Sequence, residues 1–328
     1  MKRTIATLCL VALFAGCSGS SSLPGEVVGE VIEVPAPSTT AAPECTDEQV
    51  QTEDATRSYE PVASATDGPT VTAIRERGRL IVGVSGDTLL FGARNPLTGQ
   101  LEGFDIDMVK AVARAIFATP ADAEPPIEYR VITYAQRLPS LEAGDVDVVA
   151  HTMTINCRRW LRIAFSSEYF AAGQKVLVKK DSTAQSIDDL NAEGARVCAP
   201  EGSTNIDELR NDTERYGNIE VIGTADISDC LVAMQQGEAD ATTGDDTVLA
   251  GFAAQDPTTQ VVGEQFTEEP YGLGFNRDAV DFVQFVNALL DEMRADGRLD
   301  EIYARWLVPA LTTEVPAPPP AVYGRSVP

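Results

Sequence analysis

The stretch HTMTINCRRW, residues 151–160, places short hydroxyl side chains close to a pair of arginines. Thr152 and Thr154 precede Arg158 and Arg159 by a few residues. A guanidinium donates two parallel hydrogen bonds to a carboxylate, and its planar fork fixes their direction. The stretch therefore has the chemistry to bind a carboxylate. The alternative for Arg159 is a solvated helix residue, and we adopt that interpretation for Arg158 and Arg162.

Two further polar groups lie in the second half of the chain. Ser203 and Thr204 precede the helical pattern NIDELRN, and free N–H groups at a helix start favour an anion. Simple N-capping is the plainer interpretation of these two residues and is compatible with it. Asp245 and Asp246 end the stretch ADATTGDD, where a carboxylate can pair with an ammonium group or cap the next helix.

The elements that would position these residues alternate between strand and helix. RLIVGVS, IEYRVIT and DVDVVA predict strands separated by the helical stretches FDIDMVKAVARAIFA and RLPSLEAG, and a second α/β series begins at QKVLVKK. PYGLGFN is predicted as one strand, followed by two helical segments broken near Gly297. LEAGDVDVVAHTMT and MQQGEADATTGDDT share one pattern, in which a strand delivers polar groups at its carboxyl end. Ligands bind at such strand ends in open α/β sheets, so two α/β lobes are expected.

Bulk composition limits the possible partners. The chain has 328 residues, which suits two lobes, and a net charge of −25 with a pI near 4.3. Nucleic-acid binding needs a basic surface, and the sequence shows none. An anionic ligand would have to be held by a few local cations against a repulsive overall field.

The amino-terminal segment predicts export. Lys2 and Arg3 precede an apolar run that is too short to span a bilayer, and Ala15 and Gly16 precede Cys17. This pattern resembles the lipobox of bacterial lipoproteins, although Phe14 stands where leucine is usual; ordinary signal cleavage is the alternative. We expect residues 1–17 to be a lipoprotein signal peptide with Cys17 lipidated, residues 18–69 a disordered acidic Pro/Ser/Thr-rich stalk, and residues 311–328 a Pro-rich tail.

Four cysteines remain after Cys9 leaves with the signal and Cys17 takes lipid. An even number in an exported chain indicates two disulfides, for which three pairings are possible. Cys198 and Cys230 lie in the same half of the chain, so we favour that pair, which leaves Cys45 with Cys157. No CxxC motif is present and the chain has one histidine, so we expect no metal site and no cofactor.

Taken in order, these motifs resemble the extracellular solute-binding proteins of family 3, the polar amino-acid receptors of ABC importers. The resemblance is carried by RLIVGVS, GQLEGFDIDMVKAVA, LEAGDVDVVAHTMTINCRRWLRIAFSSEYF, VCAPEGSTN, GEADATTGDDTVLAG, FTEEPYGLGF and LDEIYARWL. It implies an α/β fold of the type II Venus-flytrap class. Lobe 1 would comprise residues 70–170 and 272–310, lobe 2 residues 171–271, and two strands near 167–175 and 268–275 would form the hinge. The lipobox, stalk and cysteine pattern look most like actinobacterial glutamate/glutamine-type binding lipoproteins.

The resemblance also implies roles for individual residues. Arg159 matches the family arginine that binds the α-carboxylate of the ligand, with contacts from Thr152 and Thr154 on one lobe and Ser203 and Thr204 on the other. Asp245 matches the aspartate that binds the α-ammonium, which leaves Asp246 as the helix cap. Tyr134 matches a position that stacks on the ligand. The family usually has glutamate where this chain has Arg158.

The side-chain end of the ligand is less defined by the sequence. Arg94 and Arg137 could each reach a distal carboxylate, and His151 lies directly before the binding stretch. Ser85 stands where the family often has aspartate. We expect a monomeric receptor, not an enzyme, that is anchored by lipid at the extracellular face of the membrane. It would bind glutamate or aspartate by lobe closure and deliver it to an ABC permease. Glutamine or asparagine binding, a sensor role with a membrane partner, and a dehydratase using Glu201 or His151 are the alternatives.

Overall fold

The computed structural model describes residues 53–62, 68–308 and 317–327. The predicted signal peptide, Cys17, Cys45 and most of the predicted stalk lie outside these residues.

Lobe 1 is built on a five-stranded sheet with the order β5-β1-β6-β14-β7. Its strands are β1 (Leu80–Val84), β5 (Ile127–Val131), β6 (Val148–Ala150), β7 (Ile163–Phe165) and β14 (Gly274–Asn276). The strand β1 pairs in parallel with β5 and β6, whereas β14 runs antiparallel to β6 and β7. Every residue of β1 is buried, as expected for a strand covered on both faces.

Helices and a small sheet surround this core. They are α3 (Pro69–Arg77), α4 (Phe104–Phe117), the 3₁₀ helix η2 (Tyr134–Gln136), α5 (Arg137–Glu142), α6 (Cys157–Trp160), α12 (Val280–Asp296) and α13 (Arg298–Trp306), with strands β2 (Asp87–Thr88), β3 (Gly92–Arg94) and β4 (Leu101–Glu102). The apolar stripe predicted on α4 is buried along its whole length. Helix α12 ends at Gly297, whose φ of +84° lies in the left-handed region that glycine tolerates.

Lobe 2 is built on a six-stranded sheet with the order β10-β9-β11-β8-β12, in which β13 also pairs with β8. Its strands are β8 (Phe170–Lys179), β9 (Arg196–Pro200), β10 (Glu220–Thr224), β11 (Ala241–Asp245), β12 (Thr259–Val262) and β13 (Glu268–Tyr271). Its helices are α7 (Ile187–Glu193), α8 (Thr204–Asn211), α9 (Thr213–Tyr216), α10 (Ile227–Gln236) and α11 (Asp246–Gln255). The order agrees with the second α/β series expected from the sequence.

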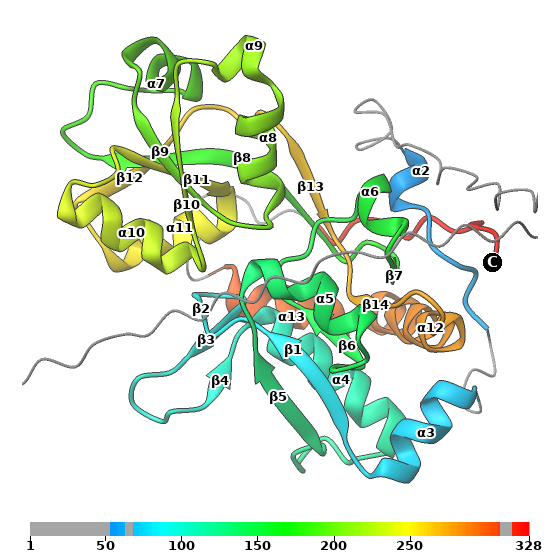
Figure 1. The fold of residues 1–328 in the computed structure, drawn as a ribbon. Helices are drawn as coiled ribbons and strands as arrows, with labels where there is room; N and C mark the ends of the chain where they lie inside the picture. The colour runs from blue at the N-terminus through cyan, green and yellow to red at the C-terminus, as the bar shows by residue number, and fades with distance from the viewer. Residues whose placement is uncertain (1–52, 63–67, 309–316, 328) are drawn as a thin grey trace, which may run out of the picture. The chain divides into compact units, whose positions relative to one another are not determined.

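Two strands connect the lobes. Strands β8 and β13 pair antiparallel, with Tyr271 opposite Phe170 at the lobe 1 end (Figure 1). The prediction that PYGLGFN forms one strand is wrong, because the chain leaves one sheet after Tyr271 and joins the other at Gly274. A Cβ at Gly272, between the two strands, would lie 2.9 Å from Ile155 Cδ1, so any side chain there would have to displace Ile155.

The segment 53–62 differs from the predicted disordered stalk. It begins with α2 (Glu53–Thr56), and both Ser58 and Tyr59 are buried against lobe 1. Asn287 of α12 donates through Nδ2 to Ser58 Oγ and to the Tyr59 carbonyl oxygen. These partners lie more than 200 residues away in the chain, so local composition did not reveal them.

The described part of the carboxyl-terminal tail packs on the same surface. Tyr323 forms a parallel bridge with Ser58, and its hydroxyl donates to Asp291 Oδ1 at 2.7 Å. The guanidinium of Arg325 lies 3.8 Å from the centre of the Trp160 ring. Trp160 in turn donates from Nε1 to the Ala55 carbonyl oxygen. The two ends of the described chain therefore meet on lobe 1.

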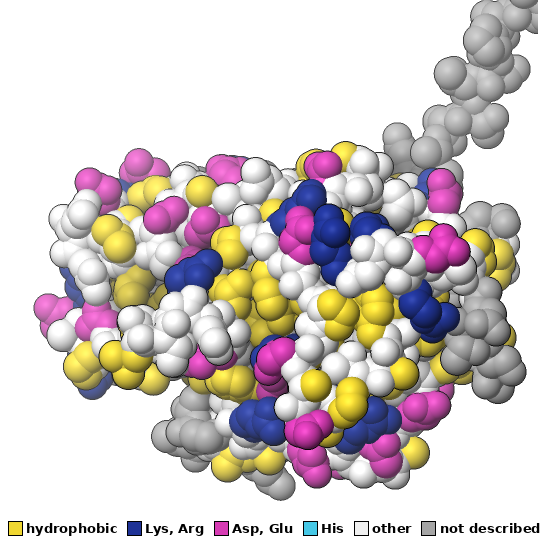
Figure 2. All heavy atoms as spheres, turned by 90° about the horizontal axis from the view of Figure 1, so that it is seen from below, with side chains coloured by type: hydrophobic (Ala, Val, Ile, Leu, Met, Phe, Trp, Pro, Cys, Tyr) yellow, Lys and Arg dark blue, Asp and Glu magenta, His cyan; other side chains and the backbone are white. Residues whose placement is uncertain are grey.

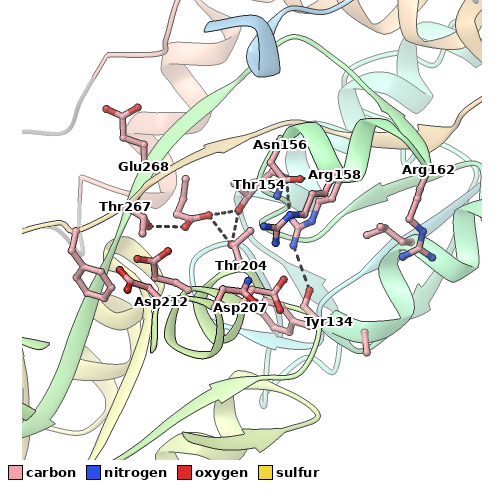
Figure 3. Close-up of a pocket in the computed structure, with 18 of the residues that line it drawn as sticks. Tyr134, Thr154, Asn156, Arg158, Arg162, Thr204, Asp207, Asp212, Thr267 and Glu268 are labelled. Atoms are coloured by element: carbon pink, nitrogen blue, oxygen red, sulfur yellow. Dashed lines mark hydrogen bonds between the residues drawn. The ribbon is translucent and has the colours of Figure 1, made fainter. Parts of the chain in front are cut away.

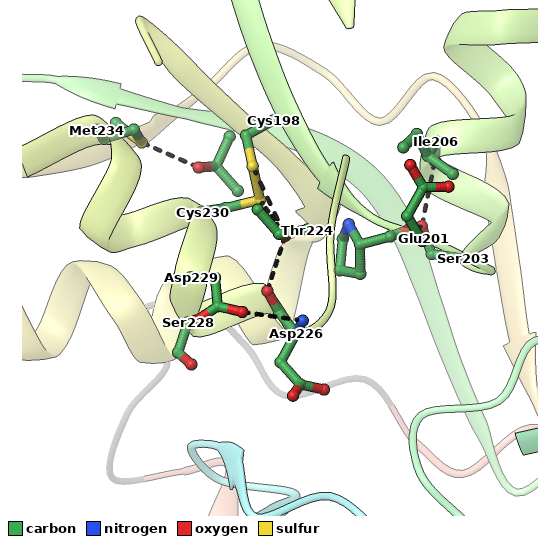
Figure 4. Close-up of a disulfide and its surroundings, with 12 residues drawn as sticks. Cys198, Glu201, Ser203, Ile206, Thr224, Asp226, Ser228, Asp229, Cys230 and Met234 are labelled. Atoms are coloured by element: carbon green, nitrogen blue, oxygen red, sulfur yellow. Dashed lines mark hydrogen bonds between the residues drawn. A yellow bond between two sulfur atoms is a disulfide. The ribbon is translucent and has the colours of Figure 1, made fainter. Parts of the chain in front are cut away.

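A disulfide links β9 to α10 within lobe 2. It joins Cys198 to Cys230, which confirms the favoured pair, and Thr224 lies beside both sulfur atoms (Figure 4). Cys157 is also disulfide-bonded. Its predicted partner Cys45 lies outside the described residues, so that pairing stays a prediction.

Candidate functional site

Arg159 is held between the two lobes by backbone carbonyl groups. It lies on α6, where the side chain of Asn156 caps the helix by accepting from the Arg159 amide at 2.9 Å. The guanidinium donates from Nη1 to Thr154 O at 2.7 Å and from Nη2 to Gly202 O of lobe 2 at 3.4 Å. Its exposure is 6%. Burial and the neighbouring Arg137 lower the pKa of Arg159 to about 9, so the group stays charged at neutral pH.

Arg137 is buried and bound to four backbone carbonyl groups, and unlike Arg159 it does not line the cavity described below. Its guanidinium donates to the carbonyl oxygens of Tyr134, His151, Thr152 and Gly202 at 3.0–3.1 Å. The ring of Tyr134 lies 4.5 Å from the guanidinium carbon. Arg137 therefore joins the loop of Gly202 in lobe 2 to the predicted binding stretch in lobe 1, which is a positioning role that the sequence did not indicate.

Arg94, His151 and Ser85 were also considered for the side-chain end of a ligand, and none of them lines the cavity described below. Arg94 is exposed, and its Nη1 donates to Gly99 O at 2.6 Å. His151 is fully buried beside Tyr134, with Nε2 3.1 Å from Ile132 O. Burial and Arg137 lower the pKa of His151 to about 3, so the ring is neutral. Ser85 is buried and donates to Asp87 Oδ1 at 2.8 Å.

The threonines of the binding stretch face in different directions. Thr152 has a φ of +41°, and its amide donates to Asp105 Oδ2 at 2.8 Å. Burial raises the pKa of Asp105 to about 6, and Tyr169 donates to its other oxygen. Thr154, by contrast, directs its hydroxyl toward the second lobe and lies 3.2 Å from the Thr204 hydroxyl. The two predicted hydroxyl contacts from opposite lobes are thus brought together.

The loop before α8 presents the lobe 2 side of the site. Ser203 caps α8 by accepting from the Ile206 amide at 3.2 Å and donates to Pro200 O. The capping role that the sequence allowed is therefore observed. Gly202 has a φ of +79°, and a Cβ there would lie 2.7 Å from the Ala135 Cα of lobe 1. The close approach of the lobes at this point requires glycine.

Asp245 ends β11 as a buried carboxylate with 6% exposure. It accepts from Asn205 Nδ2 at 2.8 Å and from the Tyr271 hydroxyl of the hinge strand. Burial and the nearby Glu269 raise the pKa of Asp245 to about 7. The expected cap at Asp246 is wrong, because helix α11 starts at Asp246 and Asp245 occupies the N-cap position. Asp246 accepts instead from the adjacent Thr247 amide and from Gln265.

Glu269 is the site residue that the sequence analysis missed. It lies on β13 with 2% exposure, and its Oε2 accepts from Thr154 Oγ1 at 2.6 Å and Thr204 Oγ1 at 2.7 Å. Its Oε1 accepts from Thr267 Oγ1 at 2.7 Å. Dashed lines in Figure 3 show these bonds leaving Thr154, Thr204 and Thr267. The alternation along β13, with Glu268 exposed and Glu269 and Tyr271 buried, was the signal that could have found it.

Some of these residues border a cavity of about 740 Å³. Its lining includes residues from lobe 1, lobe 2 and the hinge: Tyr134, Thr154, Arg159, Gly202, Thr204, Thr267 and Glu269 (Figure 3). The guanidinium of Arg159 and the carboxylate of Glu269 both line this space, whereas Asp245 is buried beside Tyr271 and is not among the lining residues. Such an arrangement suits a small zwitterion, because each charged end of the ligand can find an opposite partner. Within the described residues, no three histidine, cysteine or acidic side chains gather as metal ligands would.

Comparison with known sequences gives a match over most of the chain. Residues 80–309 match the family described as bacterial extracellular solute-binding proteins, family 3. The ABC transporter glutamine-binding protein GlnH of Bacillus subtilis is 37% identical over 238 residues, covering 73% of this chain and 84% of that protein. The glutamate-binding protein GluB of Corynebacterium efficiens is 32% identical, covering 70% of this chain and 79% of that protein.

Comparison with solved structures gives the same fold. The ancestral amino acid-binding protein AncCDT-1, a precursor of cyclohexadienyl dehydratase, superposes with a TM-score of 0.64. It is 30% identical and covers 72% of this chain and 99% of its own. The expectation of two α/β lobes joined by a pair of crossing strands is thus confirmed, and the same topology serves proteins of more than one activity.

Proposed function

Because the chain belongs to family 3 of the bacterial extracellular solute-binding proteins, we propose that it captures a polar amino acid outside the cell and delivers it to an ABC importer. The observation that carries this proposal is a buried guanidinium on lobe 1, Arg159, together with a buried carboxylate on lobe 2, Asp245. Arg159 binds the α-carboxylate of the ligand, and Asp245 binds its α-ammonium group.

The placement of these two groups on different lobes explains how binding drives closure. Only a closed cleft lets one small molecule contact both charged groups, so the ligand binds the closed form more tightly than the open form. The first amides of α8 complete the polar surround of the α-carboxylate, and Tyr134 covers the ligand from lobe 1. The hydroxyls of Thr154 and Thr204 donate to Glu269 and cannot also donate to the α-carboxylate, so we assign them to the side-chain end of the ligand. Thr152 and Ser203 act through the backbone groups that they orient.

We place glutamine ahead of glutamate as the ligand. The acidic preference drawn from the sequence needed Arg94 or Arg137 at the side-chain end, but Arg94 is exposed and Arg137 is bound to carbonyl groups. A side-chain amide needs no cation and suits this arrangement better than a second carboxylate does. One relative is named a glutamine-binding protein and another a glutamate-binding protein, which supports these two amino acids as the candidates.

Calorimetric titration of the purified protein with glutamine, glutamate, asparagine and aspartate tests two claims: that the protein binds a polar amino acid, and that it prefers glutamine to glutamate. We expect glutamine to bind with a Kd of about 1 μM, which corresponds to roughly −8 kcal/mol. Tighter binding of glutamate would restore the acidic preference. Binding of none of the four would remove the amino-acid receptor assignment altogether.

The membrane setting belongs to the same proposal. A signal peptide of residues 1–17, lipid on Cys17 and a stalk would hold a monomeric body at the extracellular face, where it meets a permease. Over the described ranges, no helix has the length and apolar character needed to cross a membrane. Labelling with a palmitate analogue, with Cys17→Ala as the control, tests the anchor. Co-purification of a non-transport membrane protein in place of a permease would favour the sensor role.

We propose that the site binds without turnover. The residues suggested for acid–base chemistry are engaged elsewhere, since His151 is neutral and buried and Glu201 is paired with Arg210 at 2.7 Å on the surface. Incubation with prephenate-like acids should leave them unchanged. Formation of a dehydrated product, abolished by Glu201→Gln, would instead support the dehydratase alternative.

A further inference from the structure

Glu269 is a third charged group in the cleft that the binding of an amino-acid backbone does not require. It extends from the hinge strand and contacts both lobes, through Thr154 of lobe 1 and Thr204 of lobe 2. It lines the same cavity as Arg159 and is buried like Asp245. A carboxylate held in this position affects what else can enter the cleft.

The first effect concerns hydrogen-bond direction. A threonine hydroxyl has one hydrogen to donate, and a carboxylate can only accept. Because Thr154 and Thr204 both donate to the same oxygen of Glu269, each can offer only lone pairs to another molecule. Lone pairs attract N–H donors, such as an amide or an ammonium group, and repel a carboxylate.

The second effect concerns charge balance. The cavity is lined by more carboxylates than guanidinium groups, its charged residues being Arg158, Arg159, Arg162, Asp207, Glu208, Asp212, Glu214, Glu268 and Glu269. A net neutral zwitterion leaves the charge of this lining unchanged, whereas an amino acid with an additional carboxylate adds an unpaired negative charge. Burying an unpaired charge is costly because little water remains to solvate it.

We propose that Glu269 sets the charge selectivity of the site by rejecting an acidic ligand side chain and admitting its amide. This inference rests on the proposed function, since it names the residue that separates glutamine from glutamate at that site. Glu269 does not bind the α-carboxylate or the α-ammonium group of the ligand; Arg159 and Asp245 bind these groups.

The test is the variant Glu269→Gln, compared with Glu264→Gln. The two substitutions make the same chemical change on the same segment, but Glu264 is exposed and is not among the residues that line the cavity. Calorimetry with glutamine and glutamate gives the ratio of the two affinities in each protein. We expect Glu269→Gln to shift this ratio toward glutamate by about ten-fold or more, and Glu264→Gln to leave it as in the wild type.

Two other results would overturn the inference. One is an unchanged ratio in a folded Glu269→Gln protein; the other is loss of both ligands, which would mean that Glu269 holds the site together. Thermal unfolding establishes folding, and Glu269→Ala, which also frees both hydroxyl hydrogens, should shift the ratio in the same direction if Glu269→Gln does not fold. A wild-type protein that binds no amino acid would instead remove the proposed function, so the two failures are distinguishable.

Discussion

At the scale of single residues, the buried guanidinium of Arg159 should be the largest contributor to affinity. Replacing it in Arg159→Gln removes the cation for the ligand carboxylate, and we expect affinity to fall by about 30-fold or more, equivalent to roughly 2 kcal/mol. Arg196→Gln is the control, because Arg196 forms an exposed ion pair with Asp240 at 2.7 Å and is not among the residues that line the cavity. Calorimetry that gave equal losses for both variants would contradict the assignment.

The raised pKa of Asp245 predicts that binding depends on pH. In the free protein this carboxyl is protonated below a pKa of about 7, and it must ionise to pair with an ammonium group. Affinity should therefore weaken by about ten-fold for each pH unit below 7 and level off above it. Titrations at pH 5.5, 6.5 and 8 measure this slope. Asp245→Asn should bind weakly with no such slope; a slope that persists in this variant would point to another group.

The residues of the site differ in how far sequence could reveal them. Arg159, Thr154, Thr204 and Asp245 follow a family motif, and the structure brings the two threonines together between the lobes. Glu269 lies within the matched motif FTEEPYGLGF, but the motif assigned it no role, because its contacts come from threonines 115 and 65 residues away in the chain. Arg94 and Arg137 could be recognised in the sequence as possible ligand contacts. The sequence did not reveal that both instead donate to backbone carbonyl groups.

At the scale of elements, hydrophobic periodicity predicted most helices and strands because each buries a face that its own sequence defines. It did not predict where β13 ends and β14 begins. The break occurs because residues 268–271 pair with the lobe 2 sheet whereas residues 274–276 pair with the lobe 1 sheet. It also missed the packing of 53–62, where the stabilising partners are Asn287, Trp160 and the tail. Local patterns identify elements, whereas tertiary partners decide which irregular segments become ordered.

The disulfide between β9 and α10 makes a stability prediction for lobe 2. It closes a loop with a sequence separation of 32, and the chain-entropy estimate for a loop of that size is about 3–4 kcal/mol. We expect Cys198→Ser with Cys230→Ser to lose a stability of that order in urea unfolding, with proteolysis starting in lobe 2. Identical unfolding of the variant and the oxidised protein would show that the link adds nothing.

At the scale of the whole molecule, the net charge is −25. On the face that Figure 2 shows, basic and acidic side chains lie interspersed. Many of the arginines pair with carboxylates, as Arg196 does with Asp240 at 2.7 Å and Arg210 with Glu201. These exposed pairs add little stability individually. The excess of negative charge disfavours self-association.

Several buried carboxyls make the stability of the molecule depend on pH. Burial raises the pKa of Glu168 and Asp245 to about 7 and that of Asp105 and Asp226 to about 6. In this range the folded protein binds more protons than the unfolded chain, so stability falls as pH rises through these values. We expect Tm to increase by several degrees from pH 8 to pH 5.5 in the absence of ligand.

Thermal unfolding across this pH range measures the effect, and Glu168→Gln provides the comparison. Removing one titrating group should make the rise in Tm smaller while leaving its direction unchanged. A Tm that is flat or falls toward pH 5.5 would mean that these carboxyls are not held in their protonated form by the fold.

Residues 53–62 and 317–327 both pack on lobe 1, so the amino-terminal segment that precedes them enters the folded body at that lobe. Under the proposed function, lipid on Cys17 would tether the protein to the bilayer through lobe 1, the lobe that contains Arg159 and Trp160. Ligand-driven closure would then move lobe 2 relative to the membrane plane. A permease that distinguishes a loaded receptor from an empty one would detect the position of lobe 2.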